Sequence, residues 1–340
     1  MATGLLSGGI VHLHATRQCN LSCLHCYSTS SPAERSYLPL APLLDALSLL
    51  HSHGYATLSL SGGEPLLYPD LRSLVREARR IGYRISLISN GYPLTGGRFD
   101  DLLPELSAIA ISLDGAPATH DRLRRQAGAF ARAEAAMARL ADLGHAFGIA
   151  FCVGRSSLGD LPWASEFAAS KGASLLQFHP MAAMGRAASS CPDELLSPND
   201  KARLYLTIEI LKASAPDGLF VQLDLTTAAT LLSREHAFAG LSGATGAANP
   251  LLAGVINPLI IDETGALSPV AYGMPKFYQI ADIADGGGMD HAISDYLERG
   301  TRPLATLVER LFNEFKGQPD TFVDWYERIA LLATKETVPS

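Results

Sequence analysis

The stretch CNLSCLHCYS, residues 19–28, holds three of the five cysteines of a 340-residue chain within ten positions. A disulfide joins two cysteines, and a closed structural zinc site takes four protein ligands. Three thiolates can instead hold three irons of a cubane cluster and leave the fourth iron without a protein ligand, which is the open position of a reactive metal site. We therefore expect Cys19, Cys23 and Cys26 to hold one [4Fe-4S] cluster.

Two other interpretations of the clustered cysteines stay open at this point. A zinc ion could take a histidine as its fourth ligand, and His12, His14 and His25 are the histidines near the cluster in the sequence. The cysteines could also be unligated residues of a buried core. The number of clustered thiols, three, favours the iron–sulfur cluster over both.

The apolar residues around this cluster follow a repeated strand–helix pattern. Strands are expected at 10–16, 56–62, 83–89, 108–114, 147–153 and 174–180. Helices are expected near 40–53, 70–81, 120–143, 160–171 and 199–214, with a weaker one within 98–106. Such alternation predicts parallel βα units joined by right-handed crossovers. Residues 1–215 are therefore expected to form an α/β fold, a partial (β/α)6 TIM-like barrel.

The pattern changes after residue 215. A further strand at 218–225 and a loop rich in Gly, Ala and Ser at 240–250 precede a hairpin signal at 255–273. A third strand is expected at 277–283, and helical patterns follow at 290–298, 303–315 and 320–333. We expect residues 216–340 to form a small α+β cap on the barrel.

Glycine-rich and polar motifs fall where the predicted strands end. SGGEP (61–65) follows the second strand, SNG (89–91) ends the third, and SLDG (112–115) ends the fourth. In parallel α/β folds the chemistry gathers at the carboxyl ends of the strands. The three motifs and the cysteine cluster are therefore expected to form one site.

The C-x3-C-x2-C motif after the first strand, followed by GGEP, resembles the radical S-adenosylmethionine (radical SAM) enzymes. The resemblance covers roughly residues 9–190 and, more loosely, the remainder of the chain. CNLSCLHCYS is most similar to the SPASM/twitch-like branch, which contains peptide maturases, sulfatase-maturing enzymes and the molybdenum-cofactor cyclase. In these families the residue before the third cysteine is commonly aromatic, whereas here it is His25.

This resemblance implies a cofactor and a reaction. The open iron would bind the amino and carboxylate groups of S-adenosylmethionine (SAM), and a donor such as flavodoxin or ferredoxin would supply one electron. Cleavage of a carbon–sulfur bond would then give a 5′-deoxyadenosyl radical that abstracts a hydrogen atom from the substrate. The branch implies a ribosomally made peptide as substrate. The alternatives are a small molecule of cofactor, nucleoside or antibiotic biosynthesis, or a non-catalytic iron–sulfur or zinc protein that senses redox state or binds a partner.

The resemblance also implies residues that bind SAM. Glu64 would accept a hydrogen bond from the methionyl ammonium, and Gly62 and Gly63 would let the backbone approach the ligand closely. Ser112 would reach the methionyl carboxylate or serve only in a turn, and Arg155 would pair with that carboxylate through its planar guanidinium or lie on the surface. The expected cofactor-binding residues are Ser61, Gly62, Gly63, Glu64, Pro65, Asn90, Ser112, Asp114 and Arg155.

Five further residues near the strand ends each have two interpretations. Asp114 contacts the substrate or the ribose, or forms a turn. Arg186 belongs to a Gly-Arg pair that many relatives carry after the sixth strand, or lies on the surface. His12 and His14, which share a strand face, and His179 take part in acid–base steps or substrate binding, or are satisfied core residues.

The C-terminal region lacks the cysteines that hold auxiliary clusters in many peptide-modifying relatives. Val270 follows Pro269 where a cysteine would stand, and no cysteine follows Cys191. We expect a single cluster, and a reaction that ends in rearrangement, radical coupling or return of a hydrogen atom. Cys152, in the fifth strand, and Cys191, the more accessible thiol in a loop, are the candidate hydrogen-atom donors. A buried core position is the other interpretation of Cys152.

Composition limits the partners and the compartment. The chain is 47% hydrophobic and 18% charged, and its formal charge of −7 argues against a nucleic-acid binder. Residues 1–13 show no signal-peptide pattern, and no apolar run approaches the roughly 20 residues that a membrane span needs. Few, clustered cysteines are typical of a reducing compartment, so we expect a cytoplasmic protein without a membrane partner.

Overall fold

The computed structural model describes residues 8–234 and 250–337, and its main feature is one ten-stranded sheet. Seven strands run parallel in chain order around this sheet. They are β1 (Gly9–Leu13), β2 (Tyr55–Leu60), β3 (Arg84–Ser89), β4 (Ala108–Leu113), β5 (Gly148–Val153), β6 (Leu175–Pro180) and β7 (Phe220–Leu223). The predicted partial α/β barrel is confirmed, and the sheet continues beyond the six predicted units.

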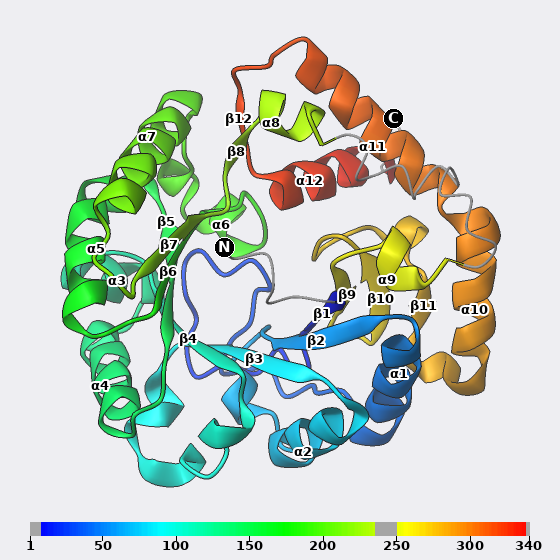
Figure 1. Cartoon of the computed structure of the whole chain (residues 1–340), viewed down its shortest axis with the longest axis horizontal. Helices are drawn as coiled ribbons and strands as arrows, with labels where there is room; N and C mark the ends of the chain where they lie inside the picture. The colour runs from blue at the N-terminus through cyan, green and yellow to red at the C-terminus, as the bar shows by residue number, and fades with distance from the viewer. Residues whose placement is uncertain (1–7, 235–249, 338–340) are drawn as a thin grey trace.

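Helices cover the outside of the curved sheet. They include α1 (Leu40–Ser52), α2 (Leu71–Ile81), α4 (Ala129–Asp142), α5 (Leu161–Ser170) and α7 (Pro198–Ser214). Figure 1 shows the strands curving around the centre of the molecule, with these helices outside them. In this view the connection between β1 and α1, which carries the cysteines, crosses the centre of the ring.

The sequence places apolar residues where these two layers meet. In β3, Ile85 and Leu87 are buried in the core, whereas Ser86 and Ile88 are half-buried. Successive side chains of a strand point to opposite faces, so one face packs against the helices and the other faces the centre of the ring. Helix α2 buries one stripe at helical spacing, namely Leu71, Leu74, Val75 and Ala78.

The C-terminal region joins the barrel sheet through its strands. Strand β9 (Leu259–Ile261) pairs in parallel with β1, with Leu259 opposite Val11. Strands β10 (Ala266–Pro269) and β11 (Ala281–Asp282) continue the sheet in antiparallel order, which confirms the predicted hairpin and third strand. The division of the chain at residue 215 stays a prediction, because the sheet is continuous across it.

The remaining C-terminal elements span the open part of the ring. Strands β8 (Thr226–Thr227) and β12 (Phe322–Val323) form a second, small sheet. The helices are α8 (Ala228–Leu232), α9 (Leu252–Val255), α10 (Met289–Asp295), α11 (Arg302–Lys316) and α12 (Trp325–Thr337). Figure 1 shows α8, α11 and α12 at the top, between β7 and the C-terminal strands. Almost all of the loop predicted at 240–250 lies outside the described residues.

Two predicted helices differ from the structure. The helix predicted at 120–143 is two helices, α3 (Pro117–Arg124) and α4, because Arg125 and Gly128 adopt left-handed backbone conformations with φ of 54° and 77°. The weak helix predicted within 98–106 is a pair of short 3₁₀ turns, Gly97–Phe99 and Leu103–Glu105. Within the described residues no helix combines the length and the apolar character that crossing a bilayer requires.

Candidate active site

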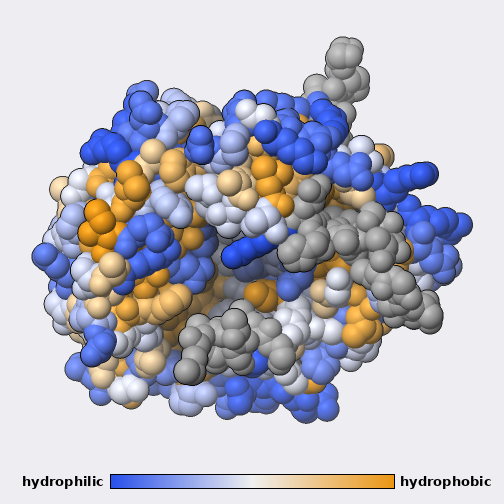
Figure 2. Space-filling view, turned by 45° about the horizontal axis from the view of Figure 1, so that its top comes forward, coloured by the Kyte–Doolittle hydropathy of each residue, from blue (hydrophilic) through white to orange (hydrophobic). Residues whose placement is uncertain are grey.

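A cavity of about 410 Å³ lies at the carboxyl ends of the strands. Turned by 45° from the view of Figure 1, the surface is hollowed near its centre, with apolar residues visible inside (Figure 2). Most of the residues predicted from the sequence line this cavity: Cys19, Cys23, Cys26, Ser61, Gly62, Gly63, Glu64, Asn90, Ser112, Asp114 and Cys152. Pro65, Arg155 and Cys191 do not line it.

The three clustered cysteines are free thiols, and all three line this cavity. Cys19 and Cys23 are buried, and Cys26 is half-buried. The Leu21 amide donates to Cys19 Sγ at 3.4 Å, and the Asn90 side-chain amide lies 3.8 Å from the same sulfur. Burial raises the pKa of Cys19 to about 12 and that of Cys23 to about 11. Buried thiols of this kind become thiolates when a metal binds them, so the donor set fits a [4Fe-4S] cluster held by three cysteines.

The histidines do not complete a zinc site with these cysteines. His25 lines the cavity, but its Nε2 lies 3.2 Å from Asp114 Oδ1. His14 stacks on Tyr272 with ring centroids 4.6 Å apart, and its Nε2 lies 3.3 Å from the Tyr27 hydroxyl. Burial lowers the pKa of His12 to about 4 and that of His14 to about 3, and neither lines the cavity. The structure therefore favours the cluster over a zinc ion with a histidine ligand.

The glycines of SGGEP bring the β2 loop against the backbone of the cysteine loop. The Gly63 amide donates to the Thr16 carbonyl at 3.0 Å, and the Glu64 amide donates to the Gln18 carbonyl at 2.9 Å. A Cβ on Gly63 would lie 2.2 Å from the Gln18 oxygen, and Gly62 has a φ of +102° that disfavours other residues. The sequence predicted close approach to a ligand, whereas the structure also shows close approach to the loop that carries the cysteines.

Glu64 is a buried carboxylate at the edge of the cavity. It accepts hydrogen bonds from the Ser89 hydroxyl at 2.9 Å, the Asn90 amide at 2.9 Å and the Leu66 amide at 3.2 Å. Burial raises its pKa to about 7, although the hydrogen bonds oppose this shift. A cationic group in the cavity would stabilise its charged form. Pro65 is buried and begins a 3₁₀ turn, Pro65–Leu67, which Glu64 caps.

The Asp114 carboxylate binds three basic side chains, Arg124, His25 and His120, and is therefore not free to bind a ribose. Both oxygens of its fully buried carboxylate accept hydrogen bonds from one edge of the Arg124 guanidinium: Nε donates to Oδ2, and Nη2 donates to Oδ1 at 2.9 Å. His25 lies on the same carboxylate, and His120 Nδ1 lies 3.5 Å from Oδ2. Burial alone would raise the pKa of Asp114, but Arg124 and His25 hold it well below the ordinary value of 3.8. From the sequence, Arg124 belongs to a basic run with Arg122 and Arg125 that predicts a solvated helix face or a contact with an acidic substrate or peptide. The structure instead buries Arg124 against Asp114.

His25, Asp114 and Cys152 place potential metal-ligand atoms within 4.8 Å of one another. The Asp114 carboxylate is already paired with the Arg124 guanidinium, whose positive charge would repel a second cation. We therefore assign no metal ion to this group.

The two arginines considered from the sequence have different places. Arg155 lies outside the cavity, where its Nε is 3.3 Å from Asp200 Oδ2, so the predicted role in binding the SAM carboxylate is not supported. Arg186 lines the cavity and donates to the Cys23 and Ser30 carbonyls, at 2.7 Å each. Arg186 therefore holds the cysteine loop in place. The preceding residue, Gly185, also lies close to this loop, because a Cβ at its position would be 2.2 Å from the Tyr27 carbonyl oxygen.

The two remaining cysteines are also distinguished by the structure. Cys152 lines the cavity from β5, and burial raises the pKa of its thiol. Cys191 is buried in a small apolar cluster with Leu123, Met181 and Ala187. The expectation that Cys191 is the more accessible thiol is wrong, because this loop folds back onto the apolar side chains after β6.

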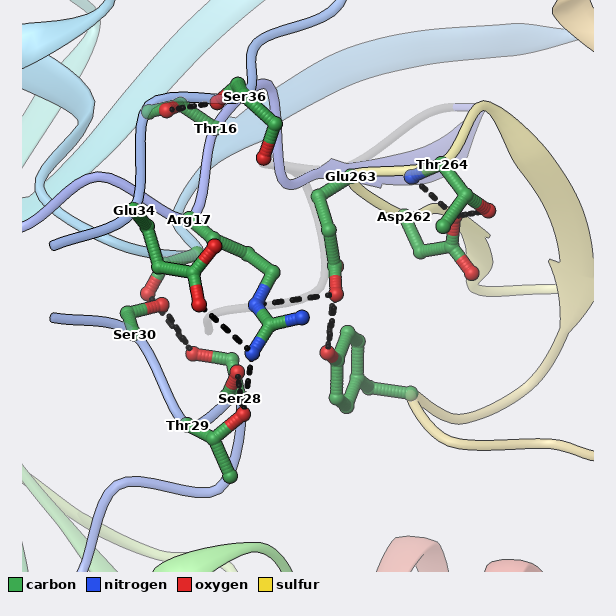
Figure 3. Close-up of polar contacts among 12 residues, drawn as sticks. Thr16, Arg17, Ser28, Thr29, Ser30, Glu34, Ser36, Asp262, Glu263 and Thr264 are labelled. Carbon is green, nitrogen blue, oxygen red and sulfur yellow. Dashed lines mark hydrogen bonds and ion pairs between the residues drawn. The ribbon is translucent and has the colours of Figure 1, made fainter.

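The C-terminal hairpin supplies one wall of the cavity. Val270, which stands where many relatives would carry a cysteine, has a φ of +67°. The next two residues, Ala271 and Tyr272, both line the cavity. The Tyr272 hydroxyl donates to Glu263 Oε1 at 3.0 Å. Figure 3 shows Glu263 facing Arg17 of the cysteine loop, with Arg17 Nε 3.7 Å from its carboxylate. The sequence suggested the outline of this segment but not these contacts.

Taken together, the three free thiols, the glycines of the β2 loop and the buried Glu64 lie in one cavity at the carboxyl ends of a partial barrel, an arrangement typical of the class of enzymes that hold a [4Fe-4S] cluster and SAM. Residues 13–155 match the radical SAM superfamily, so this part of the chain is a radical SAM domain. The superfamily uses a [4Fe-4S] cluster and SAM, and the chain fits its SPASM/twitch-like branch.

Relatives of known name support this assignment. The chain is 32% identical over 155 residues to the pre-heme d1 synthase of Dinoroseobacter shibae, over 45% of this chain and 38% of that protein. It is 34% identical over 184 residues to the PqqA peptide cyclase of Ruegeria pomeroyi, over 51% of this chain and 48% of that protein. The chain thus spans at most about half the length of these relatives.

The fold is also similar to that of Streptococcus suis SuiB bound to S-adenosylmethionine. The TM-score is 0.66 at 13% sequence identity, over 87% of this chain and 68% of that one. At this level of identity the likeness concerns the fold alone.

Proposed function

We propose that this protein is a radical SAM enzyme that abstracts a hydrogen atom from a ribosomally made peptide and thereby modifies it. The observation that carries the proposal is the single cavity in which three free thiols, the buried Glu64 and the glycines of the β2 loop lie together. When bound, the cluster and SAM supply an electron and a 5′-deoxyadenosyl radical.

The chain's own residues have distinct tasks in this proposal. Cys19, Cys23 and Cys26 hold the cluster, and Glu64 accepts hydrogen bonds from the ammonium of SAM. Ser112 lines the cavity from the end of β4 and is offered to the SAM carboxylate. Apolar side chains along the cavity, among them Leu21, exclude water from the radical.

Cys152 is the proposed hydrogen-atom donor, in preference to Cys191, because only Cys152 lines the cavity. Its S–H bond would break as a new C–H bond forms on the substrate radical, leaving a thiyl radical on Cys152. One electron from a reduced flavodoxin or ferredoxin and one proton from solvent would restore the thiol. We also propose the cytoplasm as the compartment, since such electron donors are found there.

The peptide substrate is supported by the relatives' names. PqqA peptide cyclase is named for a peptide, and SkfB of Bacillus subtilis is named for the maturation of a sporulation killing factor. A small-molecule substrate is the second proposal, because one relative is named for pre-heme d1 and no cysteine follows Cys191 here.

The test is anaerobic reconstitution of the full chain with iron and sulfide, reduction with dithionite, and addition of SAM. We expect 5′-deoxyadenosine and methionine in equal amounts, and neither from a variant with Cys19, Cys23 and Cys26 replaced by alanine. A parent protein that holds about four irons but yields no 5′-deoxyadenosine would support a non-catalytic iron–sulfur protein instead.

A further inference from the structure

A second, larger cavity opens beside the active site. This outer groove has a volume of about 920 Å³ and lies between the start of α7 and the segment that joins α11 to α12. Its wall combines apolar residues such as Leu196, Phe315 and Phe322 with charged side chains. Asp324 and Glu327 line both the outer groove and the active-site cavity, so the two cavities meet at these carboxylates.

The charges along the outer groove do not balance. Its ionisable lining residues are Lys201, Glu314, Asp320, Asp324, Glu327 and Arg328. Lys201 lies 3.5 Å from Glu327, and Arg328 pairs with Glu314. Within the described residues, Asp320 and Asp324 have no ion-pair partner. The groove therefore presents two unpaired carboxylates.

Asp324 is the unpaired carboxylate at the junction. One of its oxygens accepts a hydrogen bond from the Glu327 amide at 3.1 Å, at the start of α12. Burial, together with the negative charges of Glu327 and Asp224, raises its pKa to about 6, although the Glu327 amide and the Lys201 ammonium oppose this shift. Asp224 is already bound to His179, whose Nδ1 lies 2.7 Å away. A half-buried carboxylate that feels the negative charge of two others is stabilised by a cation that it can bind directly.

The sizes of the two cavities suggest how a substrate is divided between them. The active-site cavity, of about 410 Å³, has to hold SAM as well as the reacting part of the substrate. A substrate larger than one residue must therefore extend outward, and the outer groove is the adjoining space that can hold it.

From these observations we infer that the outer groove binds the peptide substrate and that Asp324 receives a lysine or arginine side chain close to the residue that is modified. The inference rests on the proposed function for the identity of the substrate as a peptide. It adds the place where the peptide lies and the charge that it carries there.

Fluorescence anisotropy tests this inference with two labelled pentapeptides, Gly-Phe-Lys-Phe-Gly and the same peptide with glutamine in place of lysine. We expect the parent protein to bind the lysine peptide about tenfold more tightly. Asp324→Asn should abolish this preference by weakening the lysine peptide alone, since asparagine keeps the oxygen that accepts from the Glu327 amide. The matched control Glu209→Gln, on α7 where Glu209 pairs with Lys212, should keep the preference.

A measurement on the parent alone keeps the test independent of how the variant folds. Raising the salt from about 50 mM to about 500 mM should weaken the lysine peptide and leave the glutamine peptide nearly unchanged. Equal binding of both peptides by the parent, equal weakening of both by Asp324→Asn, or binding of free lysine without either peptide would each overturn the inference. Because binding is measured without SAM cleavage, a parent that prefers the lysine peptide but makes no 5′-deoxyadenosine would reject the proposed function and retain the groove.

Discussion

At the scale of single residues, the carboxylate of Asp114 organises the wall of the active site behind the cysteines. It is fully buried and holds Arg124, His25 and His120 around it. The pattern SLDG predicted that Asp114 lies at the site, because the end of a parallel strand is where such residues gather. Its partner Arg124 could not be predicted, because the pairing depends on how α3 packs over the end of β4.

Replacing Asp114 by asparagine should lower the free energy of unfolding by about 3–5 kcal/mol, because the Arg124 guanidinium is left buried without a counter-charge. Asp100→Asn removes a pair with Arg139 at the surface and should have a much smaller effect, because solvent screens this pair. Urea unfolding of the metal-free proteins measures both. Equal effects of the two substitutions would show that the buried Asp114 pair contributes no more to stability than the surface pair.

The contribution of Asp114 should also depend on pH in a defined direction. Its pKa in the folded protein lies below the ordinary value of 3.8, so the unfolded chain takes up the proton first as the pH falls. The stabilisation is complete at neutral pH and is lost as the pH falls from about 5 toward the folded-state pKa. The difference in stability between the parent and Asp114→Asn should be about 1 kcal/mol smaller at pH 3 than at pH 7. A difference that grows in acid would contradict the assignment.

At the scale of elements, the cysteine loop between β1 and α1 is held from three sides. The β2 loop bonds to its backbone, and Arg186 at the start of α6 (Arg186–Ser190) donates to two of its carbonyls. Glu263 of the C-terminal hairpin faces Arg17. The glycines of SGGEP predicted close approach to a ligand but not this contact with the cysteine loop, and Arg186 had two alternative interpretations. The third depends on two segments about 250 residues apart, and no local pattern encodes such a pairing.

Gly63→Ala should prevent the β2 loop from packing on the cysteine loop, because the added Cβ would meet the Gln18 backbone oxygen at 2.2 Å. We expect this variant to hold less than about half the iron of the parent after reconstitution, because the loop that carries the cysteine ligands is displaced. Gly96→Ala is the matched control, since Gly96 has an extended backbone and no atom within 4 Å of the added Cβ. Iron and sulfide assays compare the two, and a Gly63→Ala protein with full iron content would show that the loop does not need this contact.

At the scale of the whole molecule, the C-terminal region is part of the barrel sheet. The periodicity of the chain predicted the strands of the hairpin correctly, because alternating residues and a turn are local signals. It did not predict that β9 would pair with β1, because register and partner are set by tertiary contacts. For the same reason the sequence predicts the strand before Arg155 but not the direction of the Arg155 side chain, which turns away from the cavity toward Asp200.

The shared sheet predicts that the barrel and the C-terminal region unfold together. The chain has two tryptophans, Trp163 in α5 and Trp325 in α12, so each can report on one part. Each single-tryptophan variant, Trp163→Phe or Trp325→Phe, is unfolded in urea and followed by both fluorescence and circular dichroism. We expect the fluorescence midpoint of each variant to equal its own circular dichroism midpoint, whichever tryptophan remains. Two separate transitions would show that the regions on either side of residue 215 are independent domains.

The claim on which the account depends is that one iron of the cluster carries no protein ligand. The most direct measurement is the electron paramagnetic resonance spectrum of the anaerobically reduced full chain, recorded with and without SAM. We expect a [4Fe-4S] signal that changes when SAM is added and that is absent from the variant lacking the three cysteines. A zinc-loaded protein without this signal, or a cluster signal that SAM leaves unchanged, would contradict it.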